Sequence, residues 1–297
     1  MLSIHLAILA ISYCSDPYVR ARTDKSDCPI GSTAPFVWWP AGCPITFNQD
    51  RTGANPLSGD VFGAVTKSLL SWVAIQDECG NVRFTEGPRI ADRTVGYDRS
   101  SSNNTNVVLF RMQDCSSLVP QNDACRRDDS CGNKYDCWDD ASNVIALTVT
   151  TYDSGSGRLL DADIELNAAG FKFTTLDTPL CPEPAPRYDC VATDVQNTAT
   201  HEFGHALGLD HTIWRDPVSG QESTMSPTSK IGETSKRQID RGSHQFVCDV
   251  YPKGAPAQDC QAVLKSSSCS ASPGDPLLAL AAWVLVWMGR RIRRRGC

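Results

Sequence analysis

The sequence predicts an α+β domain, and three observations predict it. Apolar residues over Ser58–Ile75 recur at three- and four-residue steps, the period of a helix that buries one face. Two β-rich runs, Asn143–Tyr152 and Arg158–Asn167, follow each other closely and form a candidate hairpin. A second helix begins near Thr193, because Thr193 and Gln196 have the spacing of a capping box.

The composition favours a folded globular domain. About half of the 297 residues are hydrophobic or glycine, which is the usual share for a protein with a core. This composition excludes a chain that is disordered throughout, a collagen and a polytopic membrane protein. The formal net charge is −6, and without the five arginines in the last eight residues it is −11. Because the rest of the chain is this acidic, we do not expect nucleic acid as a partner.

The elements before residue 115 follow from local patterns. Pro44–Asn48 is a candidate first strand, and Asn106–Met112 is a short β-rich run. Between them, the Ser58–Ile75 helix has one apolar stripe, which consists of Val61, Val65, Leu69 and Trp72 or Val73.

The second strand of the hairpin alternates between apolar and polar residues. Its apolar side consists of Leu160, Ala162, Ile164 and Leu166, and its polar side of Asp161, Asp163, Glu165 and Asn167. One buried face and one solvated face predict an edge position in the sheet.

Residues 114–140 predict a long loop that is held by disulfides. This stretch is acidic, rich in turn-forming residues and contains four cysteines. Its aspartates are candidate Ca²⁺ ligands, but they lack the regular spacing of a known calcium loop. A solvated acidic loop is the alternative interpretation, and we prefer it.

The second helix carries the residues with the clearest chemistry. His201 and His205 lie one turn apart on the same face, so both imidazoles can bind one metal ion. Gly208 is the residue type that lets a chain leave a helix through a left-handed conformation, after which His211 can return as a third ligand. Three protein ligands leave the fourth position of a Zn²⁺ ion open for water, as in catalytic sites. Glu202 can then act as general base towards that water and afterwards as general acid towards the leaving amine.

The segment His201-Glu202-Phe203-Gly204-His205-Ala206-Leu207-Gly208-Leu209-Asp210-His211 resembles the signature of the metzincin metalloproteases, and most closely that of the matrixin branch. Thr212 suits matrixins, and Thr224-Met225-Ser226-Pro227 resembles their Met-turn. The resemblance implies a twisted, mainly antiparallel sheet that packs on a first helix and an active-site helix, with a C-terminal helix at Ile239–Tyr251. It further implies that Met225 supports the metal site without touching substrate. An edge strand containing Asp161, Ala162, Asp163 and Ile164 would pair with an extended substrate.

Several departures from the matrixin pattern limit what the resemblance implies. Thirteen residues separate His211 from Met225, so the intervening loop is enlarged. Outside the motif only His244 remains in the expected mature domain, so the second, structural zinc of vertebrate matrixins cannot be built in the same way. Gly242-Ser243 stands where two aspartates are usual, and the Pro-Arg-Cys-Gly latency motif is absent. Cys28 could block the metal instead, although a disulfide is the ordinary fate of a secreted cysteine.

Both ends of the chain predict export and sorting. Residues 1–12 have the outline of a signal peptide, with an apolar N-terminal strand as the alternative. Residues 13–33 are an N-terminal extension, 34–252 the catalytic domain and 253–275 a linker. Residues 276–297 contain a twelve-residue apolar run and an arginine cluster, which is short for a permanent membrane anchor. With Cys269 upstream, this end resembles the MYXO-CTERM tail of myxobacterial surface proteins, which a sorting protease processes at the cysteine; a plain membrane helix is the alternative.

The cysteine count agrees with an oxidising compartment. The chain has 14 cysteines and no Cys-x-x-Cys pair, which excludes a zinc ribbon and a thioredoxin-like motif. Without Cys269 and Cys297 an even number remains, and Cys181 and Cys190 are the expected bonded pair. We therefore expect a secreted, surface-sorted zinc endopeptidase with one catalytic Zn²⁺ and a protein or peptide substrate. The alternatives are a zinc hydrolase of cell-wall amide bonds and an inactive metalloprotease scaffold that serves as a surface binding module.

Overall fold

The computed structural model describes residues 14–260 apart from 25–27, 29–30, 54–58, 102–103, 129, 183 and 185. The expected signal peptide and the sorting tail with Cys269 lie outside the described residues. Within the described part, no helix is both long enough and apolar enough to span a membrane.

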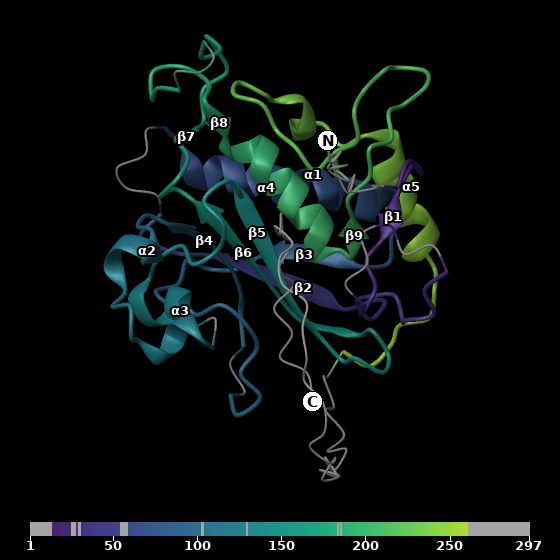
Figure 1. The fold of residues 1–297 in the computed structure, drawn as a ribbon. Coiled ribbons are helices and arrows are strands. Elements are labelled where there is room, and N and C mark those ends of the chain that lie inside the picture. Colours follow the sequence, from purple (N-terminus) through teal and green to yellow (C-terminus); the bar gives the residue numbers. More distant parts are fainter. Residues whose placement is uncertain are drawn as a thin grey trace, which may run out of the picture.

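A mixed five-stranded sheet forms the centre of the structure (Figure 1). Its strands, in spatial order, are β3 (Arg83–Glu86), β2 (Pro44–Gln49), β4 (Asn106–Arg111), β6 (Leu159–Asn167) and β5 (Ala146–Tyr152). Only β5 and β6 pair antiparallel, and the other three pairs are parallel. The expectation of a mainly antiparallel sheet is therefore wrong. Long connections allow β2, β3, β4 and β6 to run in the same direction, whereas a tight loop joins β5 to β6.

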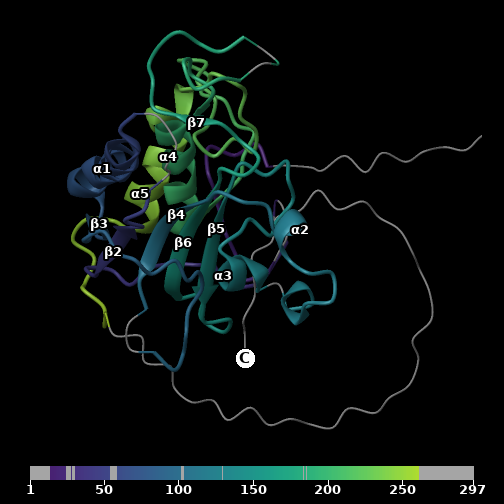
Figure 2. The same ribbon diagram turned by 90° about the vertical axis from the view of Figure 1, so that its left-hand side faces the viewer.

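Three helices cover one face of the sheet, and two short helices lie on the other side (Figure 2). The first group is α1 (Val61–Cys79), α4 (Val195–Ala206) and α5 (Arg241–Val250), and the second is α2 (Cys115–Leu118) and α3 (Cys131–Tyr135). The α+β expectation and its three main helices are thus present. The main core lies between the first group and the sheet.

Helix α1 buries the apolar stripe that the sequence predicts, although it begins three residues later and ends four residues later than expected. The Asp60 side chain caps it by accepting a hydrogen bond from Gly63 N at 2.8 Å. Trp72 is fully buried, and its indole Nε1 donates to Thr200 O at 3.0 Å. This bond fixes α1 against the middle of α4.

Short elements complete the fold. Strand β1 (Val19–Arg20) pairs antiparallel with β9 (Leu209–Asp210), and β7 (Phe173–Thr174) pairs parallel with β8 (Thr193–Asp194). Two 3₁₀ turns occupy Ala124–Arg126 and Ser235–Arg237.

The folded domain is larger than the predicted range 34–252. Strand β1 belongs to the expected N-terminal extension, yet it pairs with β9 beside the histidine motif. At the other end, Gln258 N donates to Ala41 O at 2.9 Å, and Cys260 is bonded to Cys43. Composition alone indicated a linker after residue 252, but this disulfide attaches residues 253–260 to the domain.

Six disulfides connect the twelve cysteines that the structure describes. The predicted pair Cys181–Cys190 is confirmed. The predicted disulfide-held loop is also confirmed, because two bonds lie within 114–140. Cys28 is bonded to Cys14, which argues against its blocking a metal ion. The remaining bonds are Cys43–Cys260 and Cys79–Cys248. This number of disulfides is typical of extracellular proteins.

Strand β6 is an inner strand, so the edge position predicted for Asp161, Ala162, Asp163 and Ile164 is wrong. Its polar side is also buried: Asp161 is 2% exposed and Asp163 is 1% exposed. The loop that contains Gly96 covers this side, and Gly96 N donates to the Asp163 carboxyl at 2.6 Å. The alternating pattern therefore indicated two distinct faces but not which of them water reaches.

The buried acid pair on β6 carries a testable consequence for stability. Burial raises the pKa of Asp161 to about 6, and burial together with the neighbouring Asp161 carboxyl raises the pKa of Asp163. A carboxyl whose pKa is higher in the folded state destabilises that state as the pH rises from its unfolded pKa through its folded pKa.

We expect Asp161→Asn to raise the free energy of unfolding by about 2 kcal/mol at pH 8 and to change it little at pH 4. Urea unfolding of both chains at the two pH values measures this. A larger gain at pH 4 than at pH 8 would contradict it.

Candidate metal centre and cleft

Helix α4 carries three of the predicted site residues, and its first turn holds it in place. The Asp194 side chain caps the helix by accepting from Asn197 N at 2.7 Å. The predicted capping box of Thr193 and Gln196 is thus one residue off, because β8 includes Thr193 and the helix begins at Val195. Arg237 donates to both carboxylate oxygens of Asp194, at 2.9 and 2.6 Å. This bidentate ion pair anchors the start of α4 to the 3₁₀ turn Ser235–Arg237.

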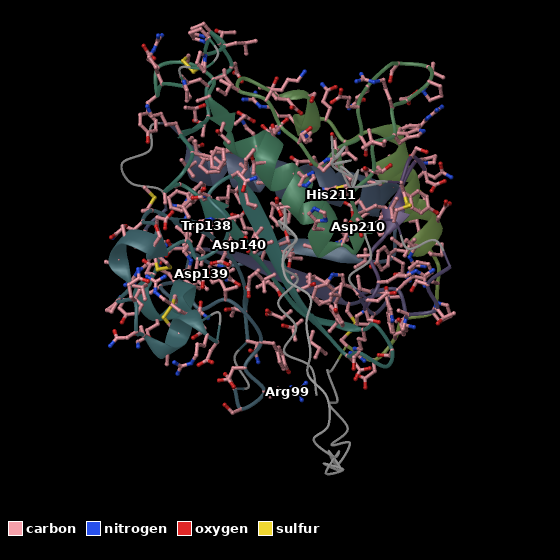
Figure 3. The ribbon with its side chains drawn as sticks, in the orientation of Figure 1. Arg99, Trp138, Asp139, Asp140, Asp210 and His211 are labelled. Atoms are coloured by element: carbon pink, nitrogen blue, oxygen red, sulfur yellow. A yellow bond between two sulfur atoms is a disulfide. The ribbon has the colours of Figure 1, made fainter. Side chains whose placement is uncertain are left out.

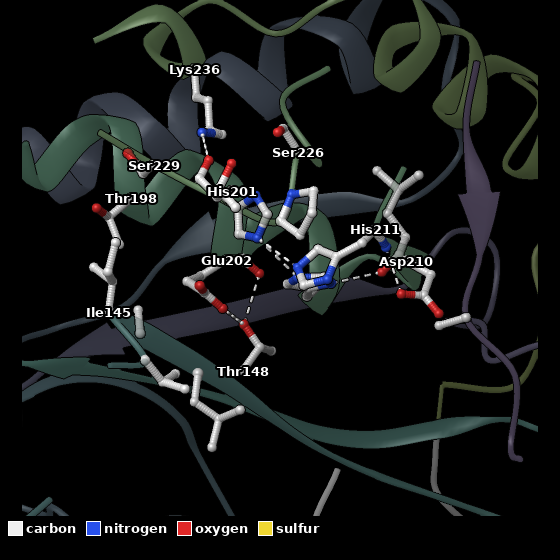
Figure 4. A pocket seen from close by; sticks show the side chains of 18 of the residues that line it. Ile145, Thr148, Thr198, His201, Glu202, Asp210, His211, Ser226, Ser229 and Lys236 are labelled. Atoms are coloured by element: carbon white, nitrogen blue, oxygen red, sulfur yellow. Dashed lines mark hydrogen bonds between the residues drawn. The ribbon is translucent and has the colours of Figure 1, made fainter. Parts of the chain in front are cut away.

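The three histidines converge as the sequence predicts (Figure 4). Their Nε2 atoms lie 3.1 Å apart between His201 and His205, 3.0 Å between His205 and His211, and 3.2 Å between His201 and His211. Among the described residues this is the one group of at least three His, Cys, Asp or Glu side chains that could hold a metal ion.

Hydrogen bonds at the far side of two rings orient these nitrogens. His201 Nδ1 lies 2.7 Å from Thr224 O, and His205 Nδ1 lies 2.9 Å from Leu209 O. A carbonyl oxygen only accepts, so each Nδ1 carries the proton and each Nε2 points its lone pair at the common centre. Lone pairs held this close repel one another unless a cation lies between them. The donor set therefore fits a metal with three nitrogen ligands and one open tetrahedral position.

The chain turns sharply between the second and third histidines. Helix α4 ends at Ala206, and Gly208 has φ +99°, the left-handed conformation that glycine adopts most readily. Strand β9 follows directly and leads to His211. The predicted exit through Gly208 is confirmed.

Met225, the residue of the predicted Met-turn, is fully buried and packs against helix α4. A methyl group added to Gly204 would overlap Met225 Sδ, so the helix and the turn meet at the glycine. Met225 O accepts from Thr212 N at 3.1 Å. The turn thus contacts both the helix that carries His201 and His205 and the segment after His211.

Asp240 holds this turn, and the sequence analysis missed it. The residue is completely buried and caps α5 by accepting from Gly242 N at 2.8 Å and Ser243 N at 3.1 Å. Its other oxygen accepts from Thr224 N at 2.7 Å, next to Met225. The predicted C-terminal helix, Ile239–Tyr251, included Asp240, whereas α5 begins at Arg241 with Asp240 as its cap. The sequence pattern therefore gave no sign of the long-range contact.

Thr148 of β5 positions the Glu202 carboxylate. Glu202 is 4% exposed, and Thr148 Oγ1 donates to its Oε2 at 2.7 Å (Figure 4). The sequence analysis did not single out Thr148, since the contact joins residues 54 positions apart.

If Glu202 acts on substrate, Thr148→Val should lower kcat by about tenfold and leave bound metal unchanged, because the variant removes the hydroxyl that orients the carboxylate. Thr148→Ser keeps the hydroxyl and should retain most of the activity. Steady-state kinetics and metal analysis of the three chains measure this. Equal losses in both variants would show that packing, not the hydrogen bond, is responsible.

A cleft of about 420 Å³ runs along the histidines. Helix α4 and the segment Ser226–Ser229 form one wall, and β5 with the preceding residues 143–145 forms the other. Ala21, Arg22 and Val37 also line the cleft. Lys236 and Ser229 lie on the side of His201 that faces away from Asp210 and His211 (Figure 4).

The outer edge of β5 supplies this cleft with backbone hydrogen-bonding groups. Strand β5 is at one end of the strand order, and among the described strands it pairs only with β6. Asn167 N donates to Ile145 O at 2.9 Å, so Ile145 is hydrogen-bonded towards β6. Because hydrogen-bonded residues alternate along an antiparallel ladder, the N–H and C=O groups of Ala146 and Thr148 point away from β6. The sheet edge that lines the cleft is therefore on β5, which no described strand covers, one strand away from the predicted position.

The described part of loop 114–140 offers no comparable cluster for Ca²⁺. Figure 3 labels Asp139 and Asp140 of this loop, and three of the loop's aspartates bind protein groups. Asp123 accepts from Lys134 and Tyr135, Asp136 pairs with Arg93 and Arg111, and Asp139 accepts from Gly132 N. These contacts give the acidic side chains a structural role in holding the loop against the sheet.

Comparisons with known proteins do not extend this description. No family model matches the chain, and no curated protein matches it significantly. The geometry of the triad, of Glu202 and of the cleft is therefore the basis for a functional proposal.

Proposed function

We propose that the protein is a zinc-dependent endopeptidase of the metzincin class, similar to matrixins. The observation that carries the proposal is the position of the His201, His205 and His211 nitrogens and of Glu202 in a cleft bounded by a free strand edge. Met225 supports the same class, because it is fully buried and contacts both helix α4 at Gly204 and the chain after His211 at Thr212, as a Met-turn requires.

The three histidines would hold Zn²⁺ through Nε2. When bound, Zn²⁺ supplies a Lewis acid that lowers the pKa of a water molecule to about 7 and polarises the scissile carbonyl. Glu202 takes the proton of the attacking water. The Thr148 hydroxyl holds Oε2 of this carboxylate, so we assign the proton to Oε1. Glu202 then gives that proton to the leaving amine nitrogen.

The edge of β5 would align the substrate. An extended peptide can add to this edge through the N–H and C=O groups of Ala146 and Thr148. Because the Thr148 side chain contacts Glu202, the peptide bond opposite Thr148 lies beside the general base. This arrangement favours an extended polypeptide over a compact small molecule.

The disulfides and the chain ends support a proposed place for the enzyme. We assign it to the cell exterior, sorted to the surface of a myxobacterium-like cell. A sorting protease would act at Cys269, and the C-terminal segment would contact the membrane before processing. The six described disulfides are consistent with this oxidising environment.

Incubation with two polymers tests the substrate class. The zinc-loaded chain is mixed with an unfolded, reduced and alkylated protein or with purified peptidoglycan, and new amino termini are identified by mass spectrometry. We expect internal cleavage of the unfolded protein. Cleavage of peptidoglycan alone would overturn the endopeptidase in favour of a cell-wall amide hydrolase. Zinc binding without cleavage of either polymer would overturn it in favour of a binding module.

A further inference from the structure

The N-terminal segment 14–22 lies alongside the part of the chain that carries His211. Val19 lies opposite Asp210 and Arg20 lies opposite Leu209 in the β1–β9 pair. Ala21 N continues this pairing by donating to Gly208 O at 2.8 Å. The residues immediately before the third histidine are therefore held by the N-terminal segment.

The residues immediately after His211 are held by the same segment. The Thr212 side chain is completely buried, and its Oγ1 lies 2.7 Å from Asp16 O and 3.0 Å from Cys14 O. Ile213 N donates to Cys14 O at 2.9 Å. A hydroxyl between two carbonyl oxygens acts as the donor, so Thr212 fastens the chain after His211 to the N-terminal segment.

The segment itself is anchored at its beginning and in its middle. The Cys14–Cys28 disulfide holds its beginning. Further along, the Tyr18 ring packs edge-on against Phe246 of α5 with ring centres 5.6 Å apart. A methyl group on Gly242, also on α5, would overlap Pro17 O, so the segment lies directly against that helix. It is thus wedged between α5 and β9.

The three histidines consequently differ in what positions them. His201 and His205 belong to one continuous helix, which fixes their separation. His211 lies beyond the helix and directly follows β9, a two-residue strand that pairs with β1. Met225 O contributes one more bond, to Thr212 N. The position of the third histidine therefore depends on contacts with a distant part of the chain.

We propose that residues 14–22 form a clamp that positions His211 for metal binding, with Thr212 as its positioning residue and the Cys14–Cys28 disulfide as its anchor. The clamp makes the N-terminal segment part of the metal site and excludes its being a removable pro-segment. Loosening it raises the rate at which the metal leaves. The inference rests on the metal-binding part of the proposed function and does not require peptidase activity.

Zinc dissociation from Thr212→Val tests the positioning role. Valine keeps the shape of threonine but loses the hydroxyl, and we expect zinc transfer to a chromophoric chelator to be about tenfold faster than from the wild type. Thr212→Ser should restore slow transfer. Thr174→Val is the matched control, because Thr174 is a buried threonine on β7 that accepts from Ala192 N at 3.0 Å. Equal rates in wild type and a folded Thr212→Val chain would overturn the proposal.

A second pair of variants keeps the test decisive if Thr212→Val does not fold. Replacing both Cys14 and Cys28 with serine removes the anchor, whereas replacing Cys181 and Cys190 removes a disulfide elsewhere in the chain. Faster zinc loss only from the first chain supports the clamp, and equal rates in the two chains overturn it.

A wild type that retains zinc without cleaving peptides overturns the endopeptidase alone. A folded wild type that takes up no zinc overturns both proposals.

Discussion

Glu202→Gln should lower kcat for peptide cleavage by about 10²- to 10⁴-fold, the usual contribution of a general acid–base residue, while bound zinc stays at the wild-type level. Glutamine keeps the size of the side chain and an oxygen that can accept from Thr148, but it cannot take a proton from water. The three histidines are untouched, so metal binding does not change. Steady-state cleavage of a fluorogenic peptide and metal analysis of both chains measure the two quantities.

The matched control is Glu78→Gln, which changes an exposed glutamate near the end of α1. It should leave kcat and zinc content unchanged. Full activity in Glu202→Gln would contradict the assigned role of the carboxylate. Loss of zinc together with activity would instead show that Glu202 acts on the metal site and not on the reacting water.

Asp240→Ala should lower the free energy of unfolding by about 4 kcal/mol, because it leaves several buried donors without an acceptor. The carboxylate accepts from the Gly242, Ser243 and Thr224 backbone and from Ser243 Oγ, the last at 2.6 Å. The variant should also bind zinc more weakly. Thr224 O orients His201, and its segment loses the anchor that Asp240 provides. Urea unfolding and competition with a chelator measure the two effects.

Asp60→Ala is the control for a cap without such a network. Asp60 also caps a helix, but its side chain accepts at an exposed position, from Gly63 N. Its replacement should cost about 1 kcal/mol and leave zinc binding unchanged. Equal losses of stability in the two variants would mean that Asp240 acts as an ordinary helix cap and does not hold the turn at Thr224 and Met225.

Local patterns predicted much of the fold, because they report which residues a helix or strand buries. The stripe from Val61 to Trp72 predicted α1, and the hairpin signals predicted β5 and β6. Strand direction and order were beyond these patterns. They depend on where long connections return the chain, as in the parallel pairing of β4 with β6. The same limit explains the buried acids of β6, since the loop that covers Asp163 is distant in sequence.

The site was predictable where its chemistry is concentrated in one motif. His201, His205 and His211 lie within eleven residues, and their spacing predicted the convergence that the structure has. The residues that support them are scattered. Thr148, Asp240 and the N-terminal segment reach the motif only through tertiary contacts, so nothing in the sequence indicates that they touch it. The motif thus predicted the candidate metal ligands, and the fold showed which residues position them.

The zinc dependence of cleavage tests the central proposal most directly. The full chain is freed of metal by dialysis against a chelator, titrated with Zn²⁺ and assayed on an unfolded protein after each addition. We expect no cleavage by the metal-free chain and a linear rise that ends at one zinc ion per chain. Cleavage that is independent of zinc, or a folded chain that holds one zinc ion and cleaves no peptide bond, would contradict the proposal.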